Sequence, residues 1–418
     1  MLSENLGFYE IDRIPYYNKI EAILHASTNG KSINWNFFDE KFSKSNWKEE
    51  PPLTIDEYYR LRAKQIRENY DYVVIRCSGG ADSTNVLYSF LNNGIFPDEI
   101  IGESPLSGLK NWDWNNTDTS VINTVSEHKY AQLPLLNAIS NRYTQIKVTH
   151  VDNFERIYNP KPDTWFINCN DGIDYHASIE GTYHDLPHLH KLAENGKTIA
   201  IVSGTDKPYL VLDENRNVYS NFSDLALNYL KIPLREKFTN VHRVPFYWTP
   251  DFPEIVIKMS HLVAKKAFGK HRDYILFASI LNKIEYRKRA DQNNNINKND
   301  VFKFLTRNLT EYVKGVNTNF NPGSSYQRRI CPYIYPSTFN SEVFQADKNT
   351  VHQTFFSPLQ DWFRILHKDS KAIQIIHSDF HNFYKMINPK YLNQSGTSFV
   401  DFNKLYKLGN VTDFTNRE

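Results

Sequence analysis

The sequence contains one short segment in which most residue types suit phosphate binding, Ser78-Gly79-Gly80-Ala81-Asp82-Ser83. Paired glycines let the backbone turn tightly and expose consecutive amide N–H groups, which bind anions. The hydroxyls of Ser78 and Ser83 can donate to phosphate oxygens, and the carboxylate of Asp82 can hold or orient Mg²⁺. The segment therefore predicts a loop that binds phosphate together with a metal ion.

The segments on either side predict how this loop is held. Asp71 to Cys77 (DYVVIRC) is apolar and β-branched, as expected for a buried strand. Ser83 to Asn93 places Val86, Leu87 and Phe90 at helical spacing and stops at Gly94. A strand, a glycine turn and a helix in this order point the helix N-terminus at the loop, which adds to its affinity for anions.

Similar units follow along the chain. Three more short apolar runs predict strands at Glu99 to Gly102, Gln145 to Val151 and Thr198 to Ser203. Predicted helical stretches at 120–143 and 184–195 separate these strands. Alternating strands and helices predict an α/β fold with a doubly wound parallel sheet of about five strands.

The loop in this setting resembles the SGGxDS signature of the PP-loop, or N-type, ATP pyrophosphatases. That family includes asparagine synthetase and 7-cyano-7-deazaguanine synthase. Every fixed position of the signature is matched, and the turn contains neither GxxxxGK[ST] nor GxGxxG. The resemblance covers about residues 70 to 210. It implies the HUP, or adenine nucleotide alpha hydrolase-like, fold and ATP and Mg²⁺ as cofactors, with Asp82 as a catalytic and metal-binding residue and Ser78, Gly79, Gly80, Ala81 and Ser83 around the nucleotide.

A second segment, after the fourth predicted strand, resembles another family motif more loosely: Ser203-Gly204-Thr205-Asp206-Lys207-Pro208. The family implies that Gly204 and Thr205 face the nucleotide and that Asp206 shares the metal with Asp82. It also implies a catalytic role for Lys207, which would neutralise charge on the α-phosphate. The same residues suit a simple turn at the end of a strand, and both interpretations stay open.

The resemblance implies adenylyl transfer, in which an acceptor oxygen attacks the α-phosphorus, pyrophosphate leaves and a second nucleophile displaces AMP. Ammonia or an amine in that step would give an amide or amidine, as in a ligase or amidotransferase, and a sulfur nucleophile would give a thiolated product. The cysteines Cys77, Cys169 and Cys331 form no CxxC pair, which favours nitrogen. Three alternatives stay open: a sulfurtransferase or sulfonucleotide enzyme on the same fold, a catalytically silent nucleotide-binding protein, and an enzyme that modifies nucleic acid bases.

Composition limits the other partners. The chain has 418 residues, 40% of them hydrophobic, and a formal net charge of +2, so no strong field attracts nucleic acid or a membrane surface. We find no signal peptide and no run that could span a bilayer. The sequence predicts a cytoplasmic protein that acts on a small-molecule acceptor with ammonia or an amine as donor. Nucleic acid binding is not favoured, and a homo-oligomer stays open.

The chain divides into three predicted parts. Residues 1–69 form a partly helical leader with a helix at 54–69 that Thr54 caps. Residues 70–245 form the ATP-binding α/β domain, including a hairpin at 209–219. Residues 246–418 form a mainly helical C-terminal region that shapes the acceptor site and contains a helix from about 249 to 268.

Several other residues that could do chemistry are better explained by structure. We predict surface or loop histidines at 184 and 188, loop support rather than anion binding from Arg328 and Arg329, core packing for Tyr247 and Trp248, and a buried filler at Cys77.

Overall fold

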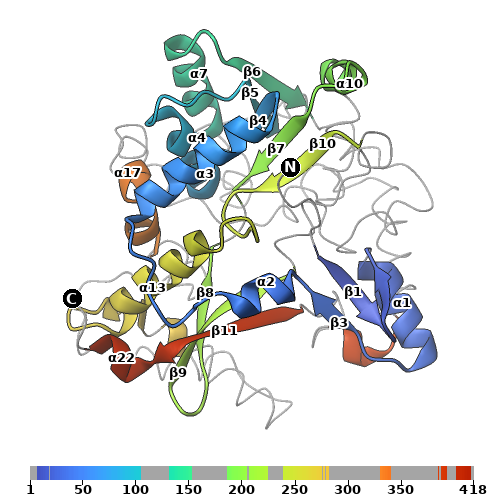
Figure 1. Ribbon diagram of the computed structural model, residues 1–418, viewed down its shortest axis with the longest axis vertical. Coiled ribbons are helices and arrows are strands. Elements are labelled where there is room, and N and C mark those ends of the chain that lie inside the picture. The colour runs from blue at the N-terminus through green and yellow to red at the C-terminus, as the bar shows by residue number, and fades with distance from the viewer. Residues whose placement is uncertain are drawn as a thin grey trace, which may run out of the picture.

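The computed structural model describes residues 7–17, 19–104, 131–152, 186–204, 207–224, 239–274, 276–277, 279–281, 330–339, 385, 387–392 and 402–415. Within these ranges the chain forms one parallel sheet and two antiparallel sheets, with helices packed around them (Figure 1). None of the helices in these ranges is long and apolar enough to cross a membrane.

Five strands form the central sheet: β4 (Tyr72–Arg76), β5 (Glu99–Ser104), β6 (Lys147–Asp152), β7 (Ile199–Ser203) and β10 (Val241–Pro245). All neighbouring pairs are parallel, and the order across the sheet is β10-β7-β4-β5-β6. The predicted α/β class and parallel sheet are thus confirmed, and the first four strands lie where the sequence predicts them. We did not predict β10, because His242 and Arg243 interrupt its apolar pattern.

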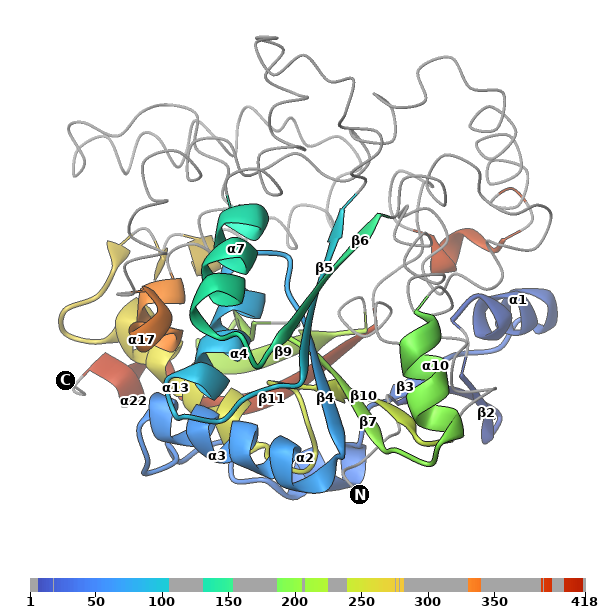
Figure 2. The same ribbon diagram turned by 90° about the horizontal axis from the view of Figure 1, so that it is seen from above.

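Helices cover both faces of this sheet (Figure 2): α3 (Ile55–Asn69), α4 (Ala81–Leu91) and α7 (Leu133–Arg142) on one face, and α10 (Pro187–Glu194) on the other. The side chains of β4 alternate between the faces, as a strand requires. Val73 and Ile75 pack in the core beneath α3, α4 and α7, whereas Val74 packs with α10. Burial on both faces explains why the sequence of β4 is a continuous apolar run.

The predicted start of α3 is confirmed in atomic detail. The hydroxyl of Thr54 accepts a hydrogen bond from the backbone N–H of Glu57, and the Glu57 carboxylate accepts one from the backbone N–H of Thr54. This capping box satisfies amide groups that the first turn of a helix leaves without partners. The predicted helix near 249–268 is also present, as α13 (Glu254–Phe268).

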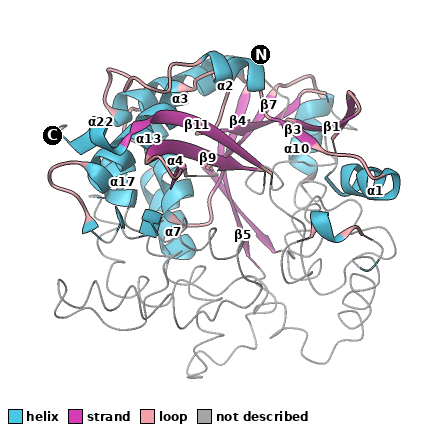
Figure 3. Cartoon of the chain, turned by 90° about the horizontal axis from the view of Figure 1, so that it is seen from below, coloured by secondary structure: helices cyan, strands magenta, loops and turns pink. Residues whose placement is uncertain are grey.

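A second sheet contains the predicted hairpin, β8 (Tyr209–Leu212) and β9 (Asn217–Ser223), together with a strand from the far end of the chain, β11 (Asn403–Asn410). Figure 3 shows β11 beside β9. We predicted a mainly helical region after residue 246 and did not predict β11. Apart from α13, the helices in the described part of that region are short, among them α17 (Pro336–Phe339), a 3-10 turn (Pro389–Tyr391) and α22 (Val411–Thr415), and residues 330–334 are also helical.

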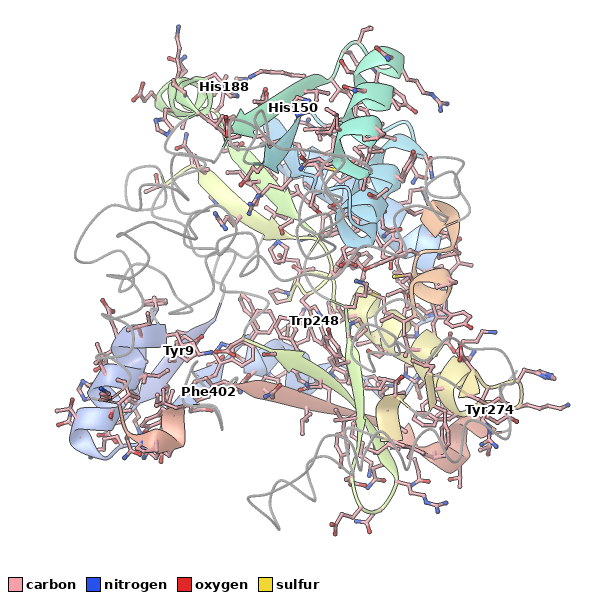
Figure 4. The ribbon with its side chains drawn as sticks, turned by 180° about the vertical axis from the view of Figure 1, so that it is seen from behind. Tyr9, His150, His188, Trp248, Tyr274 and Phe402 are labelled. Carbon is pink, nitrogen blue, oxygen red and sulfur yellow. The ribbon has the colours of Figure 1, made fainter. Side chains whose placement is uncertain are left out.

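The N-terminal residues form a third sheet, in the order β2 (Ile14–Tyr16), β1 (Phe8–Ile11) and β3 (Asn34–Asn36), with helices α1 (Lys19–Asn29) and α2 (Asp39–Lys44). A fully buried ion pair joins it to the second sheet, since Lys19 Nζ lies 3.0 Å from Asp224 Oδ2. Tyr9 donates to the same oxygen, and the backbone N–H of Phe402 donates to the other one. Tyr9 and Phe402 lie side by side where these segments meet (Figure 4).

A second buried carboxylate fixes α10 to the parallel sheet. The side chain of Glu99, at the start of β5, is fully buried and accepts hydrogen bonds from Tyr72, Thr149 and His188, with Lys147 Nζ 3.2 Å away. Burial alone would raise the pKa of Glu99, but the hydrogen bonds from Thr149 and His188 outweigh it and leave the pKa below the ordinary 4.5. His188 therefore lies on a helix and not in a loop, and its side chain, 32% exposed, is partly at the surface, so the prediction of a surface or loop histidine holds only in part.

Replacing Glu99 with glutamine is expected to lower the free energy of unfolding at pH 7 by about 2 kcal/mol, because the amide loses charge-assisted hydrogen bonds. A carboxylate with a depressed pKa stabilises the fold above its unfolded-state pKa, and this contribution is lost as the pH falls through its folded-state pKa. The difference between variant and natural chain should therefore shrink at pH 3.5. Urea denaturation at both pH values measures it, with Glu68→Gln on the exposed side of α3 as control. An equal difference at both pH values would contradict this role of Glu99.

Candidate functional site

The order of the strands brings two loops together. The chain leaves β4 toward β5 and β6 on one side, and β7 and β10 lie on the other side of β4. Residues that follow β4 and β7 therefore meet at the carboxyl edge of the sheet, with Ile75 opposite Val202 in the register. A crevice at such a reversal of strand order is where open parallel sheets bind ligands. The two segments selected from the sequence, 78–83 and 203–208, both begin at this edge.

The two serines of the first loop hold its shape. Ser83 Oγ accepts a hydrogen bond from the backbone N–H of Ser78 at 3.2 Å and donates to the carbonyl of Gly80 at 3.2 Å. Ser78 Oγ accepts from the backbone N–H of Gly80 at 3.2 Å. Gly80 is the N-cap of α4 and has no side chain to cap the helix. No side chain at the N-cap position therefore hydrogen-bonds to the amide groups of the first turn of α4. An anion can bind to these groups instead.

Gly79 is required for this shape. Its φ is +82°, and a Cβ atom built on it would lie 2.5 Å from the backbone nitrogen of Gln132, just before α7. Gln132 Nε2 in turn donates to the carbonyls of Cys77, at 3.0 Å, and Glu103, at 3.2 Å. The start of α7 thus packs directly on the loop and on the ends of β4 and β5. Cys77 is buried, as predicted.

The structure brings Asp82 and Lys207 together. Lys207 Nζ lies 2.6 Å from Asp82 Oδ2, and the side chains of Lys207 and Asp82 are 6% and 31% exposed, respectively. These residues lie 125 positions apart in the sequence. A carboxylate and an ammonium in contact beside a phosphate-type loop can hold a metal ion and a phosphate oxygen, respectively.

Gly204 lets the end of β7 approach the first turn of α4. A Cβ atom on Gly204 would lie 2.8 Å from Val86 Cγ2 and 2.9 Å from the carbonyl oxygen of Asp82. This contact joins the two predicted segments at their backbones. Thr205 and Asp206, which we predicted at the nucleotide and the metal, lie outside the described residues, as do His184, Arg328 and Arg329.

No protein-family model, curated protein or solved structure matches the chain.

Two tyrosines that we did not predict as site residues contact Asp82. Tyr335 donates its hydroxyl hydrogen to Asp82 Oδ1 at 2.5 Å, and Tyr247 donates to the carbonyl oxygen of Asp82 at 3.0 Å. Burial, together with the charge of Asp82, raises the pKa of both phenols well above the ordinary value, so both remain neutral donors. Tyr247 and Trp248 are fully buried, as predicted, and in Figure 4 Trp248 lies between the parallel sheet and the β8–β9–β11 sheet.

A further pair of buried polar residues extends this network. Asn85 Nδ2 donates to the hydroxyl of Tyr247 at 3.0 Å, and Thr338 Oγ1 donates to Asn85 Oδ1 at 2.7 Å. Aromatic residues make up 14% of the chain, so no sequence signal distinguishes Tyr247 or Tyr335 from core tyrosines. Their role is visible only once the fold brings them to Asp82.

The residues present fit a magnesium ion held jointly by protein and substrate. In the part of the chain that the structure describes, no three His, Cys, Asp or Glu side chains converge as a metal site. Asp82 offers a single carboxylate. Mg²⁺ commonly binds through one or two carboxylates together with phosphate oxygens and water, so this donor set suits a metal that arrives with a nucleotide.

Proposed function

We propose that the chain binds ATP with Mg²⁺ at the carboxyl edge of the parallel sheet and transfers the adenylyl group to an acceptor. The observation on which this rests is the contact between Asp82 and Lys207 directly beside the glycine loop at the N-terminus of α4. A carboxylate for a metal, an ammonium for a phosphate and amide groups at a helix N-terminus suit the chemistry of nucleoside triphosphates.

Each residue has a defined task in this proposal. An oxygen of the acceptor attacks the α-phosphorus, the bond from the α-phosphorus to the bridging oxygen breaks, and pyrophosphate leaves with that oxygen. The amide groups of Gly79 and Ala81 and the N-terminus of α4 stabilise the negative charge that gathers on the leaving pyrophosphate. Lys207 turns from Asp82 to the α-phosphate, and Asp82 would hold the metal. Mg²⁺, when bound, neutralises phosphate charge.

The strand order supports the finer fold assignment that we propose, a doubly wound sheet of the adenine nucleotide alpha hydrolase-like type. Helices lie on both faces, and the glycine loop follows the strand at which the order reverses. In such folds the phosphates of the ligand lie at this reversal.

We also propose that the second nucleophile is ammonia or an amine. Among the described residues the cysteines are Cys77 and Cys331, and both are buried. A buried thiol is a poor sulfur carrier, because the carrier sulfur must be able to reach the substrate. This observation favours nitrogen over sulfur as the atom that displaces AMP.

Ligand binding tests the phosphate site before any acceptor is known. ATP with Mg²⁺ and inorganic pyrophosphate with Mg²⁺ should each raise the melting temperature, since a ligand at a hundred times its Kd stabilises the fold by about 2.7 kcal/mol. Lys207→Met should remove most of the increase with ATP, because Lys207 binds the α-phosphate in this proposal. Absence of stabilisation by both ligands at millimolar concentration would contradict the proposal.

A further inference from the structure

Tyr335 occupies a position that only the folded chain creates. It lies 253 residues after Asp82 in the sequence, yet its hydroxyl is 2.5 Å from Asp82 Oδ1. Lys207 contacts the other oxygen, Oδ2. The two oxygens of the carboxylate therefore have different donors, one a neutral phenol and the other an ammonium group.

The phenol is held rigidly. Tyr335 is 1% exposed, and its ring stacks on Tyr247 with centroids 5.6 Å apart and planes inclined by 27°. The chain is anchored on both sides of it: Tyr59 donates to the carbonyl of Ile334 at 2.7 Å, and Thr338 donates to Asn85 at 2.7 Å. These anchors fix the chain on either side of Tyr335, and burial and stacking on Tyr247 restrict rotation of its side chain.

Lys207 differs from Tyr335 in the length and freedom of its side chain. Its ammonium group stands at the end of four methylene carbons and can turn toward a phosphate while its backbone stays in place. A carboxylate oxygen accepts two hydrogen bonds or one hydrogen bond and a metal. When Lys207 turns away, Oδ2 becomes available to a cation, while the donor on Oδ1 keeps the plane of the carboxylate fixed.

We infer that Tyr335 is a positioning residue for Asp82: its hydroxyl stays on Oδ1 and orients the carboxylate so that Oδ2 receives the metal ion when Lys207 turns to the nucleotide. This inference rests on the proposed function. It assigns a specific task to the segment Ile330–Phe339, which would otherwise be only part of the core. Groups that hydrogen-bond to metal ligands typically change metal affinity by ten- to a hundredfold when removed.

The test is Tyr335→Phe, which removes the hydroxyl and keeps the ring. Binding of Mn²⁺ in the presence of α,β-methylene ATP, measured by electron paramagnetic resonance, should weaken by about ten- to a hundredfold. Binding of the same analogue without metal should change less than twofold. Tyr59→Phe is the matched control, because it removes a buried hydroxyl that fixes the same segment without touching Asp82, and it should leave the Mn²⁺ affinity unchanged.

The outcomes separate this inference from the proposed function. If the natural chain binds no Mn²⁺ in the presence of the analogue, this result would overturn both the proposed function and the inference. If the natural chain binds both Mn²⁺ and the analogue, and Tyr335→Phe has the same Mn²⁺ affinity, this result would overturn the inference alone. Tighter Mn²⁺ binding by Tyr335→Phe would also overturn it, since the phenol would then compete with the metal for Asp82. An equal loss in Tyr59→Phe would show that only the packing of the segment matters.

Discussion

Replacing Asp82 with asparagine is expected to slow pyrophosphate release by at least about a hundredfold, because the change removes the charge that we propose for the metal. The side chain keeps its shape, and its oxygen can still accept the hydrogen bond from Tyr335. The buried ammonium of Lys207 loses its ion pair with Asp82, so the free energy of unfolding should fall by about 1–3 kcal/mol. Pyrophosphate release measures the first effect, and urea denaturation measures the second.

Asp71→Asn is the control for this variant. Asp71 immediately precedes the first residue of β4, at the end of the strand opposite the glycine loop. Its exposed carboxylate accepts hydrogen bonds from the backbone N–H and the hydroxyl of Thr198. The Asp71→Asn variant carries the same chemical change far from the carboxyl edge of the sheet, and it should release pyrophosphate at the rate of the natural chain. Turnover of Asp82→Asn at the rate of Asp71→Asn would refute a role for the Asp82 charge in the reaction.

Replacing Gly79 with alanine is expected to lower the free energy of unfolding by about 2–4 kcal/mol, from two causes that add. A left-handed conformation costs a residue with a side chain roughly 1–2 kcal/mol. The new methyl group would in addition lie 2.5 Å from the backbone nitrogen of Gln132, so the loop or the start of α7 must move. Because the loop amides move with it, stabilisation by Mg²⁺ and pyrophosphate should also be lost.

Gly94→Ala separates these two causes. Gly94 has a similar φ, +66°, but a Cβ atom there would meet nothing within 4 Å. This variant should show the conformational cost alone, about 1–2 kcal/mol, and should bind pyrophosphate normally. Equal losses of stability in the two variants, measured by denaturant titration, would show that the contact between Gly79 and α7 is unimportant.

The sequence predicts those parts of the fold whose signals are local. β4 is recognisable because both of its faces are buried, and α3 because Thr54 and Glu57 form a capping box within one turn. β11 could not be predicted in the same way. Its residues alternate between exposed and partly buried over most of its length, and its pairing with β9 joins residues about 185 positions apart.

The same distinction applies to the candidate site. The glycine loop has a local signature, and the segment with Lys207 follows a predicted strand, so their meeting could be expected from a parallel sheet. Tyr335 lies in no local signature and follows no predicted strand. Its segment contains Tyr333 and Tyr335 two positions apart, and only the packing of Ile330–Phe339 against α4 decides which hydroxyl reaches Asp82.

The position at which ATP is cleaved tests the proposed adenylyl transfer most directly. The natural chain and the Asp82→Asn variant would each be incubated with ATP, Mg²⁺ and a pooled metabolite extract, and the products identified by mass spectrometry. We expect AMP and pyrophosphate from the natural chain alone, together with a mass gain in one metabolite that identifies the acceptor. ADP and phosphate would place the reaction at the γ-phosphate and contradict adenylyl transfer.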